Sequence, residues 1–434
     1  MKRTVSIFLI LAGITFLAAE SPLVLTEEMA VAMALGQNLS LQASRLDLEN
    51  SEDLDNNSWN VLLPDFSASG GITRSEALIS DPLPNARDSW SVNGSVSAKL
   101  TLNYGAVLSM NTYSLRYDAQ SVLFEMEQDR LITNVRKQFS YLLANKENLI
   151  LEKKNLELAE KRYEQTLANY ENGLASELSV MEAKTSYESL RPAYTNTRTS
   201  YETQVMSFKN LLGFDMALEI DVEGTLDIPL LDLDADDLVQ SYLANRRDVQ
   251  TGVTSLELEE NLLAAVKAGK LTPSLILSSD WSSSAGDLTD PDWADSATLS
   301  LLMSFPLNGY IGGSSEKVDI RHAERSVEQA RLSLEETMER AEQEIRTLVM
   351  QLEGYKENME ITGLSVDLAQ KTYEMTEFAY QQGTREILDV EAAQNKLLAA
   401  NQDLLQSRYN YLSGLLDLDY ALNTTLEEMN GEYK

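Results

Sequence analysis

The sequence predicts an α-helical protein with a transmembrane β-barrel portion, made from two structural repeats that each contribute a long helical hairpin and two strands. Three observations support this fold class. Apolar residues recur every seven positions through two long stretches without proline, which indicates coiled-coil helices of unusual length. Segments of about ten residues alternate apolar and polar side chains, as the strands of membrane barrels do. Both patterns occur twice, in the same order.

The first residues have the layout of a secretory signal peptide. Lys2 and Arg3 precede an apolar run from Val5 to Leu17, and Ala19 offers a small residue near the cleavage point. The run is too short to span a membrane as a helix. The chain has no cysteine, which excludes disulfides, thiol catalysis, thiolate metal sites and a lipidated N-terminal cysteine. We therefore expect residues 1–19 to direct export and then to be removed.

The formal net charge of −33 makes nucleic acid a poor partner and cations a natural counter-charge. The acidic residues are spread over predicted helix faces, so the charge is equally compatible with solubility alone. The single histidine, His322, lies among charged neighbours and is expected at a helix surface. No nucleophile elbow, P-loop or HExxH motif occurs. We expect no catalysis, no cofactor and no metal site.

The repeat is clearest in the hairpins. The segment from Leu158 to Ala183 aligns without gaps on the segment from Leu368 to Ala393, 210 residues later, and Gly173 meets Gly383. The heptad register continues on both sides of the aligned segments. A strict period of seven residues predicts a left-handed supercoil, because an untwisted helix would let the apolar seam drift off its partner.

Two proline-free stretches predict single helices roughly 90 to 100 Å long at 1.5 Å per residue. They are residues 112–171 and 314–381. Gly173 and Gly383 are expected to end them in left-handed caps, after which an antiparallel helix returns. The expected hairpin tips are residues 172–176 and 382–386. Pro192 predicts a kink or a local break in the first returning helix.

A weaker match relates the N-terminal parts of the two halves. Leu25 to Glu49 aligns with Leu233 to Glu257 and shares its leucine frame, and each segment is expected to form one helix that ends near a proline, Pro64 or Pro273. Beside the hairpin match, this similarity indicates duplication of the whole chain.

Strands are expected after each of these prolines. Residues 90–104 alternate apolar and polar side chains throughout, and residues 296–307 repeat the pattern except at Leu302. Two partner strands are expected near 65–75 and 273–283, with Trp90 and Trp281 as interface anchors. An antiparallel sheet with one face on a protein core gives the same alternation. The signal peptide and the lack of elements to cover such a sheet favour the barrel.

Four strands cannot close a membrane barrel, because small barrels need eight and an open edge in lipid leaves backbone groups unpaired. The chain is therefore expected to form a closed oligomer. Three copies would supply twelve strands, although strand count alone does not separate three copies from two or four.

At this level of detail the sequence resembles the TolC-like outer-membrane efflux family over essentially the whole mature chain. The residues that carry the resemblance are YQQGTREILDV from Tyr380 to Val390, SRYNYL from Ser407 to Leu412, and the first-repeat counterpart YENGLASELSV. The resemblance implies a homotrimeric channel-tunnel with a barrel in the outer membrane and a helical tunnel in the periplasm. It divides the chain into repeat 1 (20–213), an equatorial segment (214–236), repeat 2 (237–420) and an equatorial C-terminal tail (421–434).

The resemblance also implies the site residues. Tyr380, Arg385 and Asp389 match the family's pore gate, in which a tyrosine and arginine network and a ring of aspartates close the tip. Ser179 and Ala392 stand where the family often has aspartates, which implies a looser gate. The alternative interpretation of Asp389 is an ordinary solvated carboxylate on a helix. The tips expected to contact a periplasmic adaptor are Asn172, Gly173, Leu174, Gln382, Gly383 and Thr384, where the glycines could instead only cap helices.

What the resemblance implies for function is a passive exit duct of a tripartite efflux or type I secretion system, driven by an inner-membrane pump. The heptads alone would also allow a structural coiled-coil protein of the periplasm or cell surface without transport activity, although the strands speak against it. Nothing in the sequence names the cargo.

Overall fold

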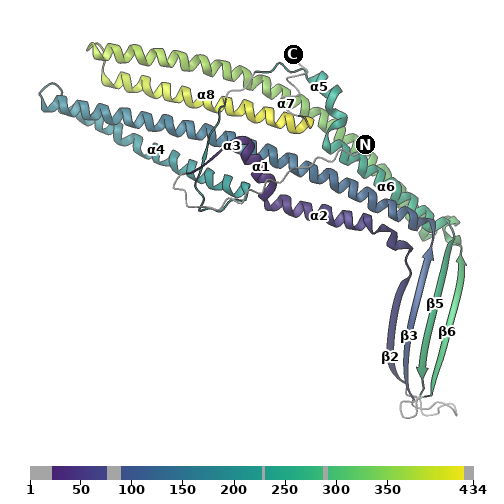
Figure 1. Cartoon of the computed structure of the whole chain (residues 1–434). Coiled ribbons are helices and arrows are strands. Elements are labelled where there is room, and N and C mark those ends of the chain that lie inside the picture. The colour runs from purple at the N-terminus through teal and green to yellow at the C-terminus, as the bar shows by residue number, and fades with distance from the viewer. Residues whose placement is uncertain (1–21, 76–88, 227–229, 287–291, 425–434) are drawn as a thin grey trace, which may run out of the picture.

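The computed structural model in Figure 1 describes residues 22–75, 89–226, 230–286 and 292–424. The expected signal peptide and most of the C-terminal tail lie outside these residues. The molecule is elongated, with a four-stranded sheet at one end and two long helical hairpins at the other. None of the helices in the described part is long and apolar enough to cross a membrane.

The sheet contains the four expected strands in the antiparallel order β2-β3-β5-β6. Their bounds are Asp65–Ser75 (β2), Ser89–Leu102 (β3), Ser274–Ala285 (β5) and Trp293–Ser304 (β6). Two expected ends were wrong, since Tyr104 already belongs to a helix and Leu307 to a 3-10 turn, Leu307–Tyr310 (η3). Asn103 sets the first boundary, because its side-chain oxygen accepts the Ala106 amide at 2.7 Å and caps the helix.

The two faces of the sheet differ as the alternation predicts. Phe66 and Leu299 lie on one face and are 76% and 75% exposed. The other face carries hydroxyl pairs across neighbouring strands, such as Ser67 with Ser97 at 2.7 Å. Leu302, the exception in the sequence pattern, stands directly opposite Ile276 on that face. Among the described residues no helix packs along the sheet, so the chain itself supplies no core for the apolar face.

The two hairpins are formed by α3 (Tyr104–Glu171) with α4 (Glu177–Leu212) and by α7 (Ser315–Gln381) with α8 (Ile387–Leu422). Helix α4 runs through Pro192 without interruption, so the local break was wrongly expected. Pro192 removes one backbone amide, and its ring is exposed to solvent. Because α4 packs along α3, the helix tolerates this loss.

The expected single helices of residues 25–49 and 233–257 are each two helices. The first pair is α1 (Glu27–Gln37) and α2 (Leu39–Asn56), separated at Asn38. The Asn38 side chain accepts the Leu41 amide at 3.0 Å and donates to the Leu211 carbonyl at 2.9 Å, which favours a new helix start over continuation.

The second pair is α5 (Ala235–Tyr242) and α6 (Arg247–Leu271), joined by the 3-10 turn Leu243–Asn245 (η2). The residue before α6 is Arg246, whose buried guanidinium donates to Asp248 at 2.8 Å and to Glu344 of α7 at 2.5 Å. Burial alone would raise the pKa of Asp248, but hydrogen bonding and the charge of Arg246 outweigh it and lower that pKa. The buried Arg246 thus links the start of α6 to α7 and fixes the bend between α5 and α6.

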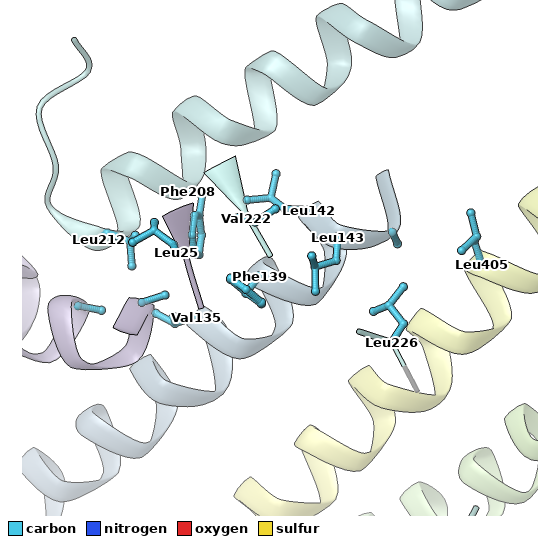
Figure 2. Packing of buried hydrophobic residues seen from close by; sticks show 13 residues of the cluster. Leu25, Val135, Phe139, Leu142, Leu143, Phe208, Leu212, Val222, Leu226 and Leu405 are labelled. Atoms are coloured by element: carbon cyan, nitrogen blue, oxygen red, sulfur yellow. The ribbon is translucent and has the colours of Figure 1, made fainter. Parts of the chain in front are cut away.

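A small parallel sheet at the equator was not predicted. Strand β1 (Leu23–Leu25) pairs with β4 (Ile220–Val222), so Leu25 is a strand residue rather than a helical one. Figure 2 shows the apolar cluster around it, in which Leu25, Phe139 and Phe208 converge from β1, α3 and α4. The start of the described chain therefore packs with residues 214–226, which were expected to form the equatorial segment.

A second cluster occupies the other repeat, and the long hairpins bury matching positions in both. The pairs separated by 210 residues are Val135 and Ile345, Phe139 and Val349, Leu142 and Leu352, Phe208 and Leu418, and Leu212 and Leu422. Each long hairpin thus has an apolar core at the end away from its tip, and the first core also includes Leu405 of α8.

We predict that Gly309→Ala destabilises the junction between sheet and helices. A Cβ at Gly309 of η3 would lie 2.1 Å from the backbone oxygen of Lys270, at the end of α6, and backbone cannot move aside cheaply. The expected loss is about 1–3 kcal/mol or more of unfolding free energy, measured by thermal denaturation in detergent. Gly312→Ala is the matched control, because a Cβ there meets nothing within 4 Å. Equal melting temperatures for both variants would contradict the prediction.

Candidate functional site: the hairpin tips and the polar cluster behind them

The tip of the first hairpin is a compact helix stop. Helix α3 ends at Glu171, and Gly173 follows with a φ of 76° in the left-handed region that favours glycine. The Gly173 amide donates to the Tyr170 carbonyl at 2.9 Å, and the Leu174 amide donates to the Asn169 carbonyl at 2.8 Å. This bond pair defines a Schellman cap, so the expected capping role of the glycine is confirmed.

The second tip repeats this geometry. Gly383 has a φ of 73°, its amide donates to the Tyr380 carbonyl at 2.8 Å, and the Thr384 amide donates to the Ala379 carbonyl at 3.0 Å. The Thr384 hydroxyl adds a bond of 2.9 Å to the same Ala379 carbonyl. Two tips of the same backbone shape therefore stand at the end farthest from the sheet (Figure 1).

The returning helices start differently. Ser176 caps α4, since its hydroxyl oxygen accepts the Ser179 amide at 3.1 Å, whereas Glu386 makes no side-chain cap for α8. Apolar side chains are exposed around the first tip: Leu174 is 80% exposed and Leu178 of α4 is 67% exposed. Exposed leucines on a rigid turn form a surface that can be covered by another protein.

The expected gate residues occupy two places. Tyr380 lines a groove of about 350 Å³ between the hairpins together with Leu178, Ser179 and Leu388. Arg385 instead faces Asp389 one turn along α8, with its guanidinium nitrogen 3.5 Å from the carboxylate oxygen. Both partners are exposed, which makes this a weak pair. Within the described chain no hydrogen bond joins Arg385 to Tyr380, so the tyrosine and arginine do not meet in one copy.

Ser179, at the position where an aspartate would accept the arginine, is already used locally. Its amide and hydroxyl both bond to Ser176, the hydroxyl oxygens lying 2.9 Å apart. The structure therefore brings Tyr380 and Ser179 to one groove without a charged link between them.

Behind the tips, a polar cluster that sequence analysis did not find joins the hairpins. Gln394 of α8 accepts a hydrogen bond from Arg162 of α3 and donates one to Asn155 of α3. Arg162 also donates to the Tyr373 hydroxyl of α7 at 3.2 Å. Asn155 and Gln394 are buried, where hydrogen bonds are worth most and unpaired groups cost most.

The chemistry of this cluster is structural. Burial raises the pKa of the Tyr373 hydroxyl, and a hydrogen bond to Glu377 raises it further against the opposing charge of Arg162. The phenol therefore stays protonated at neutral pH, so it can donate to Glu377 while it accepts from Arg162. A second polar contact lies nearer the equator, where Gln402 donates to Asn148 at 2.9 Å and to Glu152 at 3.0 Å. Together these bonds hold α8 against α3 along the two hairpins.

We predict that Gln394→Leu loosens the two hairpins near their tips. The change removes the donor to the Asn155 side-chain oxygen and one of the two partners of Arg162, at a cost of roughly 1–3 kcal/mol in local stability. Hydrogen exchange in α8 around this position should accelerate, and proteolysis at the tips should follow. The control is Gln370→Leu, which removes only an exposed contact within α7. Unchanged exchange in Gln394→Leu would show that the cluster adds nothing to the packing.

In the part of the chain that the structure describes, no group of three or more acidic or histidine side chains is placed to hold a metal ion. The one histidine, His322, is exposed on α7 as expected. The candidate site consists of the two hairpin tips, the groove beside Tyr380 and the polar cluster around Gln394.

Comparison with known proteins gives one family. Residues 30–214 and 238–424 match the family described as outer membrane efflux protein. The outer membrane protein TolC of Salmonella enteritidis is 28% identical over 165 residues, which is 36% of this chain and 32% of that protein. The aligned part of the chain thus spans about a third of this relative's length.

Solved structures extend the likeness to nearly the whole chain. Crystal structures of CusC that describe folding and transmembrane channel formation match with a TM-score of 0.75 at 17% identity, over 92% of each chain. The open state of the MtrE outer membrane channel of Neisseria gonorrhoeae matches with a TM-score of 0.73 at 17% identity, over 92% of this chain and 89% of that one. At such low identities the likeness shows the fold.

Proposed function

This chain belongs to the outer membrane efflux protein family, and we propose that it is the passive exit duct of a tripartite efflux or type I secretion system. The observation that carries the proposal is the sheet, which has one bare apolar face and one hydroxyl-lined face and continues directly into α3 and α7. A structural coiled-coil protein without transport activity is not favoured, because it would leave the apolar face of this sheet exposed to water.

The dimensions of the apolar face fit an outer membrane. The apolar side chains from Ala297 on β6 to Phe305, one residue beyond the strand, cover about 27 Å at 3.4 Å per residue. At a strand tilt of about 40° this is roughly 21 Å, close to the apolar band of about 25 Å in such barrels. Trp281 stands opposite Ala297, the next row on that face holds Ser283 and Asp295, and the row beyond it is apolar again, with Ala285 opposite Trp293. This placement supports an anchoring role for Trp281 at the membrane interface.

Closure of the barrel requires several copies. Within the described chain β2 and β6 each pair on one side only, and lipid offers no hydrogen bonds for the other side. Joining β6 of one copy to β2 of the next is a head-to-tail contact, which closes when the rotation per copy completes a ring. We propose three copies, giving twelve strands and twelve long helices.

The hairpin tips are where we propose that the duct opens and contacts its partner protein. We propose that a periplasmic adaptor covers the exposed leucines at the tips and that the α7–α8 hairpin moves against α3 when the duct opens. The polar cluster around Gln394 resists that movement. Three copies of Asp389 at a narrow mouth would favour cations. An inner-membrane pump supplies the energy, and the cargo is not identified by any pocket.

We predict that Leu299→Arg prevents stable membrane insertion and that Ser300→Arg does not. The two residues are adjacent on β6, so their side chains point to opposite faces of the sheet. In the proposed barrel Leu299 faces the lipid and Ser300 faces the lumen. An arginine on the lipid face near the bilayer centre costs about 2–4 kcal/mol. Heat-resistant oligomers and outer-membrane fractionation provide the measurement. If Ser300→Arg were the damaging change, the sheet would face the other way.

We further predict that the purified protein is a trimer that forms low-conductance, cation-selective channels in planar bilayers. Asp389→Asn should reduce the selectivity for cations without changing the mass of the oligomer, because only a carboxylate ring is removed. A monomer without channel activity would overturn the proposed function. Unchanged selectivity in Asp389→Asn would remove this residue from the gate and leave the duct in place.

A further inference from the structure

We propose that α2 of one copy packs on the first part of α7 of the next copy, with Asp53 facing Arg321 and His322 and with Glu49 facing Arg325. This inference rests on the proposed oligomeric duct. It adds which residues of these two helices face one another and in what register, which strand closure alone does not give.

The template for this contact lies inside the chain, where α6 packs antiparallel on α3. Asn261 of α6 donates to the Thr112 hydroxyl at 2.8 Å and to the Leu108 carbonyl at 2.9 Å, and Asn111 donates to Asn261 at 3.0 Å. Farther along, Arg247 of α6 pairs with Glu125 of α3 at 2.5 Å. These contacts fix both the faces and the register of the two helices.

The repeat gives each of these helices a counterpart. Helix α2 corresponds to α6 at an offset of 208 residues, and α3 corresponds to α7 at an offset of 210 residues. The contact of α2 with α3 and its counterpart, that of α6 with α7, both form within the chain. The counterpart of the α3–α6 contact is a contact of α2 with α7, which does not form to any extent in the described chain (Figure 1).

In a ring of copies that missing contact falls between neighbours. Asn261 maps to Asp53, Asn111 maps to Arg321, and Thr112 maps to His322. All three mapped residues are exposed in the single chain. A neutral hydrogen-bonded contact inside the chain therefore maps onto a carboxylate opposite two basic side chains between copies.

The charges of the two surfaces are complementary. Helix α2 carries five acidic residues and one arginine. On α7, the acidic residues Asp319 and Glu324 already pair with Lys270 and Lys267 of α6 at 2.9 and 3.0 Å. Arg321 and Arg325 form no ion pair within the described residues, which leaves a basic face directed away from α6.

Spacing agrees with one continuous interface. Glu49 and Asp53 are four residues apart on α2, as are Arg321 and Arg325 on α7, so each pair lies on one helix face. Heptad spacing adds apolar neighbours to these faces, and they are exposed in the single chain: Leu39 and Leu46 on the side of Asp53, and Leu332 on the side of Arg325. The surface left bare in one copy thus has both the charge and the apolar stripe of a helix contact.

Engineered cysteines test the register, because the chain has none of its own. The full chain carrying Asp53→Cys and His322→Cys should form covalent dimers and trimers on non-reducing gels after mild oxidation. Each single variant should stay monomeric on the same gel. The pair Glu52→Cys and His322→Cys is the matched control, since Glu52 lies about 100° around the helix and should link at least tenfold less. An in-chain control, Asn261→Cys with Thr112→Cys, should link without increasing the mass.

Charge exchange provides a second readout. Asp53→Arg and Arg321→Asp should each lower the temperature at which the oligomer dissociates, and the double variant should regain most of that loss. A trimer with channel activity that shows no 53–322 crosslink and no rescue would overturn this interface and leave the proposed duct standing. A monomer without channels would overturn the proposed function, and the interface with it.

Discussion

Strands β2 and β6 end the sheet with backbone groups that have no partner strand among the described residues. Such groups can bond to water in solution, but the interior of a membrane offers them nothing. The sheet is stable in an outer membrane only if another copy pairs with each edge. Because the outer edges belong to different strands, the contact between copies would be head-to-tail. The helices are continuous with the strands, so they would follow the same rotational symmetry. The paired helices and the proposed α2–α7 contact are consequences of that closure.

The two repeats share a packing plan but have diverged where the hairpins meet. Both bury the same heptad positions at the equator, as the matched pairs from Val135 with Ile345 to Leu212 with Leu422 show. The polar cluster, in contrast, has no copy. Positions 210 residues from Asn155, Arg162 and Gln394 hold Ser365, Thr372 and Lys184. In the proposed ring, the equivalent boundary between copies would bring Ser365 and Thr372 toward Lys184, so the arrangement of Asn155, Arg162 and Gln394 would not be repeated there.

Local patterns were enough to predict the elements whose signal is repeated many times. The long helices follow from heptads and the strands from period-two alternation, while Gly173 and Gly383 mark the tips because a left-handed cap favours glycine. The breaks at Asn38 and Arg246 were missed, because each depends on a residue distant in the sequence. Asn38 donates to the Leu211 carbonyl, and the buried Arg246 pairs with Glu344. Strand β1 was missed because three residues carry no periodicity. A glutamine at position 394, on the apolar seam between Val390 and Leu397, was the available signal for the polar cluster.

The sequence by itself determined the repeat, the lengths of the helices, the two faces of the strands and the resemblance to the efflux family, because each depends on neighbours within a few turns or on aligned motifs. Only the tertiary structure decided which residues meet across the hairpins. Gln394 and Asn155 are 239 residues apart, and Arg385 proved to face Asp389 rather than Tyr380. Such contacts depend on the rotation of each helix about its axis, which is set by packing of the whole bundle and not by any local pattern.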